Sequence, residues 1–197
     1  MSISQSVPLP VPVVAAARPI SWQRRLLLIV LAVVILFAFT YALAWYNSSR
    51  LGKEFFQDAE VSYSDGRYLD ALVGYDEVNK QANTRIPRGG YYQTTRLWAS
   101  NFALPKPDFY AVASERIQTI MQDKLDINSA EEFIQRYTGR NHPLFPDIYL
   151  RLGQLYEASG DNSSAIEIYR DCATLFPDRP DITQAAKENL SRLGVKN

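Results

Sequence analysis

The feature that most constrains this chain is an uninterrupted apolar run, Leu26 to Tyr46, with the sequence LLLIVLAVVILFAFTYALAWY. It holds no charge, Pro or Gly, and its one clearly polar member, Thr40, can bond back to its own helix. As a helix, its 21 residues would be about 31 Å long, roughly the thickness of a bilayer's hydrocarbon core. A lone span in lipid must be helical, because every backbone polar group needs an internal partner. The run therefore predicts a transmembrane helix over residues 26–46.

Two other interpretations of the run compete with this one. A buried helix of a soluble core normally shows a polar stripe, and this run has none. A cleavable signal peptide is the second alternative, because Ala42, Leu43 and Ala44 resemble a small-residue cleavage site. The run is longer than the 7–15 apolar residues usual in such a peptide. We therefore favour a retained anchor.

The residues at the two ends of the run resemble interfacial anchors. Aromatic side chains suit the headgroup layer, and arginines can extend toward lipid phosphates. The predicted membrane-interface residues are Trp22, Arg24, Arg25, Trp45 and Tyr46.

Charge is divided unevenly although the chain is neutral overall. Residues 1–25 form a Pro-rich basic tail with three arginines and no acidic residue, which leaves a net charge of −3 on the remainder. Positive charge before a span favours a cytoplasmic N-terminus, although Arg50 and Lys53 just after the span oppose this bias. We expect a single-pass protein of the cell (inner) membrane with its C-terminal domain extracytoplasmic. The acidic remainder argues against nucleic acid as a partner.

Residues 47–197 are expected to be all-α. Asn47 to Ser49 offers a short polar break, and apolar residues then recur at helical spacing between Gly and Pro signals. Ser129 and Glu132 form a capping-box pattern. The expected helices are 51–64, 68–81, a short one near 92–101, 108–125, 129–137, 147–158, 163–176 and 181–193.

Two windows share a pattern of small and aromatic residues. In the second window, Gly160 is followed five residues later by Ala165 and then by Tyr169; in the first, Gly66 is followed by Ala71 and then by Tyr75. Small residues allow two antiparallel helices to cross closely, and a Gly ends the first helix.

This pattern resembles the tetratricopeptide repeat (TPR) family. The likeness covers repeats at about 54–81 and 146–179, with a closing helix at 181–194. The first window departs from the family at Asp58, where an apolar residue is expected. The segment around LFPDRPD also resembles bacterial envelope TPR arrays, which supports a periplasmic domain.

The resemblance implies partner binding along the first helix of each hairpin. One TPR class grips C-terminal carboxylates with Lys and Asn, but the corresponding positions here include Phe56 and Glu60, which disfavours that ligand. An aromatic group that includes Phe102 is a second candidate surface, with core packing as its alternative. The candidate partner-binding residues are Lys53, Phe56, Glu60, Tyr63, Leu150, Arg151, Gln154 and Glu157 in the groove, and Tyr91, Tyr92 and Trp98 in the aromatic group.

No catalytic, metal-binding or cofactor-binding pattern is recognised. The single His142 is expected to be a solvated loop residue, and the single Cys172 a small core residue. Glu131 and Glu132 are not expected to form an acid–base pair, because adjacent residues on a helix point in different directions. The sequence therefore predicts a non-enzymatic accessory or scaffold subunit of a membrane complex, with lipid and other subunits as partners and no small-molecule substrate. An envelope chaperone or assembly factor is the alternative.

Overall fold

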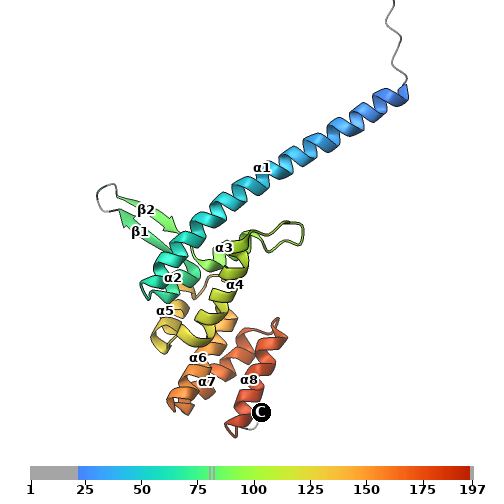
Figure 1. Cartoon of the computed structure of the whole chain (residues 1–197). Helices are drawn as coiled ribbons and strands as arrows, with labels where there is room; N and C mark the ends of the chain where they lie inside the picture. Colours follow the sequence, from blue (N-terminus) through green and yellow to red (C-terminus); the bar gives the residue numbers. More distant parts are fainter. Residues whose placement is uncertain (1–21, 80, 82, 196–197) are drawn as a thin grey trace, which may run out of the picture. The chain divides into compact units, whose positions relative to one another are not determined.

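The computed structural model describes residues 22–79, 81 and 83–195 (Figure 1). The tail predicted over residues 1–25 lies mostly outside these residues. The chain divides into two compact units, 1–44 and 45–197. Helix α1, Trp22–Ser64, contributes residues to both units.

Helix α1 has no break at Asn47–Ser49, so that prediction is wrong. Between Trp22 and Leu51 the sequence contains no Gly or Pro, and Asn or Ser inside a helix costs only a few tenths of a kcal/mol relative to Ala. The Thr40 hydroxyl donates to the carbonyls of Leu36 and Phe37 at 3.0 and 2.9 Å, as expected. By length and composition, α1 is the one described helix able to cross a membrane.

The second unit is predominantly helical, which confirms the predicted fold class. Its elements after α1 are α2 (Tyr68–Val73), β1 (Tyr75–Asn79), β2 (Thr84–Arg88), α3 (Tyr91–Leu97), α4 (Asp108–Thr119), a π-helical turn η1 (Ile120–Lys124), α5 (Ile127–Tyr137), α6 (Phe145–Ser159), α7 (Asn162–Leu175) and α8 (Pro180–Arg192). The three helices α6, α7 and α8 pack consecutively, as Figure 1 shows.

The helix predicted over 68–81 is wrong beyond Val73. Gly74 ends α2 with a φ of +73°, and a Cβ at this position would lie 2.4 Å from the Arg88 carbonyl oxygen. The chain then forms an antiparallel hairpin, in which Tyr75 pairs with Arg88, and the hairpin extends away from the helices (Figure 1). Only a glycine fits both the left-handed backbone and the close approach.

The contacts of Asp58 explain why this position departs from the TPR pattern. Its carboxylate accepts the Gly89 N–H at 3.1 Å and lies 3.4 Å from an Arg88 guanidinium nitrogen. Arg88 also donates to Glu77 at 2.7 Å. A carboxylate at this position therefore fixes the end of the β-hairpin against α1, which an apolar residue could not do.

Two other boundaries differ from expectation. Helix α5 begins at Ile127, because Asp126 is its N-cap and accepts the Ser129 N–H at 2.7 Å. The predicted capping box at Ser129 and Glu132 is therefore wrong. Helix α3 ends at Leu97, earlier than the expected Asn101.

The second unit contains two hydrophobic clusters. The larger one joins α1 through α6, with Phe133 and Ile148 fully buried in it. The smaller one joins α6, α7 and α8 around Tyr169 and Cys172. Because α3, α4 and α5 supply packing surface between the two repeat windows, the unit completes its core from its own helices.

Candidate protein-interaction surface

The α6–α7 hairpin is built around a close helix crossing. A Cβ added at Gly153 of α6 would lie 2.5 Å from a ring carbon of Tyr169 on α7. Ala165 is also fully buried at this crossing. The small residues singled out in the sequence therefore lie where the helices approach, and the Tyr169 ring fills the space beside them.

Charged contacts tie α8 to this hairpin. Glu157 of α6 accepts hydrogen bonds from the Tyr169 hydroxyl at 2.8 Å and from Arg192 of α8 at 2.7 and 2.9 Å. The Arg192 guanidinium, followed by the Tyr169 hydroxyl, lowers the pKa of Glu157. Burial, followed by the Glu157 contact, raises the pKa of Tyr169.

Arg179, just before α8, makes a second set of charged contacts with α6. It donates to both carboxylate oxygens of Asp147 on α6, at 3.1 and 3.2 Å, and to Asp181 at 2.7 Å. Hydrogen bonds from Arg179 lower the pKa of Asp181 to about 2. A bidentate guanidinium–carboxylate pair fixes orientation as well as distance, so these contacts set the angle at which α8 closes the hairpin.

The four groove candidates on α6 have different environments. Leu150 is buried in the cluster with α7 and α8. Arg151 is partly buried and donates to the Gln122 carbonyl and to Gln154, 3.3 Å away. Glu157 is occupied by Arg192 and Tyr169. All four side chains therefore contact other residues of the unit, and Arg151, Gln154 and Glu157 remain partly exposed.

The four groove candidates on α1 mostly face neighbouring helices. The Phe56 ring lies 5.9 Å from the rings of Tyr91 and Phe109. Glu60 accepts the Tyr91 hydroxyl and lies 3.4 Å from Arg116. The Tyr63 ring packs beneath the Arg116 guanidinium at 4.3 Å. Lys53 is the exposed member of the set.

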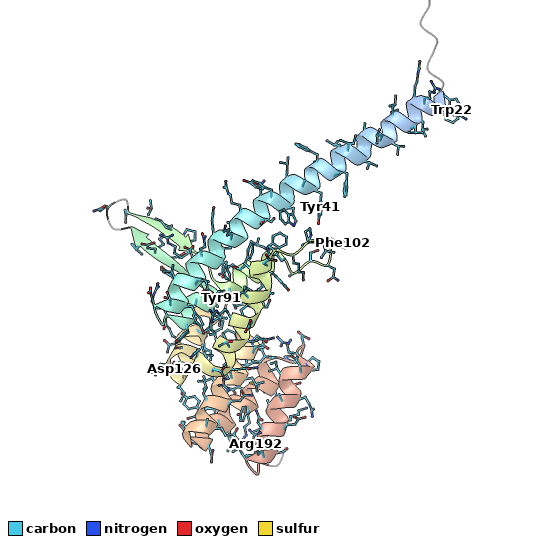
Figure 2. The ribbon with its side chains drawn as sticks, in the orientation of Figure 1. Trp22, Tyr41, Tyr91, Phe102, Asp126 and Arg192 are labelled. Carbon is cyan, nitrogen blue, oxygen red and sulfur yellow. The ribbon has the colours of Figure 1, made fainter. Side chains whose placement is uncertain are left out.

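The aromatic group is divided between core and surface. Tyr91 and Trp98 are buried, which fits the packing alternative. Tyr92 is partly buried, with its ring 5.0 Å from that of His142. Phe102 is highly exposed on the loop between α3 and α4 (Figure 2). The structure thus separates these four residues rather than gathering them into one patch.

A cleft between the β-hairpin, α3 and α5 was missed by the sequence analysis. It encloses about 470 Å³. Because it depends on the turn at Gly74, a helical prediction over 68–81 could not reveal it. The polar and aromatic residues that line it include Tyr75, Asp76, Arg88, Gln93, Arg136, Tyr137 and Arg140.

The remaining candidate reactive groups have packing roles. His142 is partly buried among Tyr92, Phe133 and Tyr137, so the solvated-loop prediction is wrong. Burial, followed by the charge of Arg96, lowers its pKa. Cys172 is fully buried as predicted, and burial raises its pKa to about 12.

Glu131 accepts the Tyr156 hydroxyl, whereas Glu132 pairs with Arg136, so the two carboxylates have separate partners. Among residues 22–79, 81 and 83–195, no three His, Cys, Asp or Glu side chains are grouped as a metal site would require.

The residues predicted to lie at the membrane interface differ in exposure. Trp22, Arg24, Arg25 and Tyr46 are exposed. Trp45 is partly buried: its indole N–H donates to the Pro105 carbonyl at 2.8 Å, and its ring lies edge-on to Trp98 at 5.9 Å. Trp45 therefore belongs both to the end of the apolar run and to the helical unit.

Comparison with known families agrees with the geometry of the hairpin. Residues 146–187 match the family model described as Tetratricopeptide repeat, which covers α6, α7 and the start of α8. No curated protein and no solved structure matches the chain. TPR domains typically serve as protein-interaction modules without enzymatic activity. The chain therefore carries a tetratricopeptide repeat over residues 146–187.

Proposed function

We propose that this chain is a membrane-anchored scaffold or accessory subunit of a multi-subunit membrane complex. In this proposal residues 26–46 cross the inner membrane, the basic tail 1–25 stays in the cytoplasm, and residues 47–197 bind partner proteins on the periplasmic side. The observation that carries the proposal is the combination of an exposed, charge-free apolar segment with a TPR hairpin in one chain.

The orientation is supported by charge. Arg24 and Arg25 immediately precede the apolar run, and no acidic residue lies before it. Cytoplasmic loops carry an excess of Lys and Arg. A domain with a net charge of −3 on the opposite side of the membrane suits a protein partner better than nucleic acid.

The partner surface is proposed to lie on the first helices of the TPR-like unit. The polar groups at this surface come from Lys53 of α1 and from Arg151 and Gln154 of α6. Beneath them lie the other candidates, Phe56, Glu60, Tyr63, Leu150 and Glu157. The exposed cation Lys53 favours a partner that brings a carboxylate, because complementary charges steer the encounter and like charges repel. Tyr92 adds an aromatic contact beside them.

An envelope chaperone or assembly factor is the second candidate function. It would bind transient clients through the same surface, with the cleft beside the β-hairpin as an additional site. The cleft beside the β-hairpin favours this candidate, because an open site of about 470 Å³ with arginine and tyrosine on its walls can receive an extended peptide.

Purification of the full chain from membranes in mild detergent distinguishes a complex subunit from a chaperone or assembly factor. A subunit is expected to carry one or a few partners in fixed ratio, measured by quantitative mass spectrometry. A chaperone would carry many clients, each far below one copy per chain. Recovery of the chain alone would contradict both proposals.

A matched pair of charge reversals tests the surface. Lys53→Glu is expected to weaken partner recovery, whereas Lys187→Glu on the exposed face of α8 is expected to leave it unchanged. Both variants should fold, since exposed substitutions usually change stability by less than about 0.5 kcal/mol. Equal recovery with both variants would exclude the α1 surface.

A further inference from the structure

The loop between α3 and α4, residues 98–107, exposes two large apolar side chains close together. Phe102 is 86% exposed and Leu104 is 57% exposed. Figure 2 shows Phe102 on this loop, which extends away from the helices of the second unit. Exposed apolar residues scattered singly need no explanation, but adjacent ones on a protruding loop indicate a contact surface.

The loop is held at both ends by packed aromatic residues, one buried and one partly buried. Trp98 at its start is 1% exposed, and Phe109 just beyond its end packs on Phe56. Between them, the Pro105 carbonyl accepts the Trp45 indole N–H at 2.8 Å. The hydrogen bond from Trp45 therefore holds the loop beside the middle of α1.

The position of Trp45 indicates what covers the loop. In sequence, Trp45 is the next-to-last residue of the apolar run 26–46, where aromatic side chains mark the boundary between hydrocarbon and headgroups. A backbone group bonded to Trp45 must lie at nearly the same depth. Phe102 and Leu104 precede Pro105 by three residues and one residue, respectively, so they lie within reach of that boundary.

The loop also has the composition of an interfacial segment. Lys106 is exposed, with its ammonium 4.3 Å from the centre of the Tyr110 ring, and Ser100 and Asn101 precede the apolar pair. Apolar side chains beside a cation suit the headgroup layer, where the former reach the acyl chains and the latter the phosphates.

We propose that the loop 98–107 inserts Phe102 and Leu104 into the lipid leaflet next to Trp45, as a second membrane contact besides the α1 span. The inference rests on the proposed membrane anchoring. A lipid surface is preferred to a protein partner because the loop is bonded to Trp45, at the end of the apolar run 26–46. The second contact would restrict rotation of the helical unit above the membrane.

Spin labelling of the full chain tests the proposal. Variants with one added cysteine, Phe102→Cys and Leu104→Cys, are labelled with a nitroxide in nanodiscs of phosphatidylethanolamine and phosphatidylglycerol, with no other protein present. Cys172 is fully buried, and the unsubstituted chain measures any labelling of it. Val33→Cys reports on the span, and Leu175→Cys, at a 54% exposed position on α7, is the matched control.

The readout is the relative accessibility of each label to oxygen, which concentrates in lipid, and to a water-soluble nickel chelate. Labels at 102, 104 and 33 are expected to prefer oxygen, and the label at 175 to prefer nickel. If 33 prefers oxygen but 102 and 104 prefer nickel, the loop proposal fails and the anchoring stands. If 33 also prefers nickel, the anchoring itself fails. Oxygen preference at 175 would equally overturn the loop proposal, because lipid contact would not be specific to the loop.

Discussion

Glu157 on α6 and Arg192 on α8 form a two-point contact, with the guanidinium donating at 2.7 and 2.9 Å to the two carboxylate oxygens. The Tyr169 hydroxyl donates to the same carboxylate from α7. One acidic side chain thus joins all three helices of the TPR segment. The closing helix is therefore held by a specific polar contact as well as by its apolar face.

This contact predicts a dependence of stability on pH. The folded-state pKa of Glu157 is lowered from its ordinary value of 4.5, so its contribution is complete above that value and is lost as pH falls through the lowered one. Urea unfolding at a series of pH values should show a shallower acid loss of stability for Glu157→Gln than for the unsubstituted chain. Parallel curves for the two proteins would contradict the assignment.

Gly153→Ala is expected to destabilise the hairpin. Overpacking against Tyr169 costs about 1–3 kcal/mol, which exceeds the gain of about 1 kcal/mol from better helix propensity. Thermal unfolding followed by circular dichroism measures the change. In a Tyr169→Leu background the penalty of Gly153→Ala should shrink, because the ring that meets the added methyl is gone. An unchanged penalty would mean that the strain lies elsewhere.

Phe133→Ala should be among the most damaging substitutions in the second unit. Phe133 is fully buried and its ring lies 4.6 Å from that of Tyr137 and 6.1 Å from that of Phe145. Deleting such a ring costs about 3–5 kcal/mol. Leu175→Ala at an exposed position is the control, with a change below about 0.5 kcal/mol. Similar losses in chemical denaturation would show that Phe133 is not a core residue.

The start of α5 offers a fourth stability test. Asp126→Ala removes the N-cap acceptor for the Ser129 N–H and should cost about 1 kcal/mol, whereas Asp126→Asn should retain most of the cap. Ser129→Ala keeps the backbone N–H, so it is expected to cost less than Asp126→Ala. A larger loss for Ser129→Ala in urea unfolding would instead support a cap at Ser129.

The TPR hairpin could be predicted from sequence because its signals are local. Gly160, Ala165 and Tyr169 stand at fixed spacing, and Gly160 and Pro177 mark the ends of α6 and α7. Each residue acts within the helix pair that contains it. The helices expected at 147–158, 163–176 and 181–193 therefore agree with α6, α7 and α8 to within two residues at each end.

The β-hairpin could not be predicted in the same way. Ala71 and Tyr75 fit the repeat pattern, yet Gly74 turns the chain between them, and the reason is a contact with the Arg88 carbonyl fourteen residues later. The partners of Asp58, Arg88 and Gly89, are 30 and 31 residues later in the sequence. The cleft formed by the hairpin, and the burial of Tyr91 and Trp98, depend on such long-range packing, which residue spacing does not encode.

Alkaline carbonate extraction of cell membranes tests the central claim most directly, when the intact mass of the extracted chain is also measured. The account predicts that the full chain stays in the membrane pellet with residues 26–46 retained, and that Leu36→Arg, which adds about 2.5–3.5 kcal/mol to the cost of inserting the span, shifts it toward the soluble fraction. A full-length chain released into the soluble fraction, or a chain cleaved after Ala44, would contradict it.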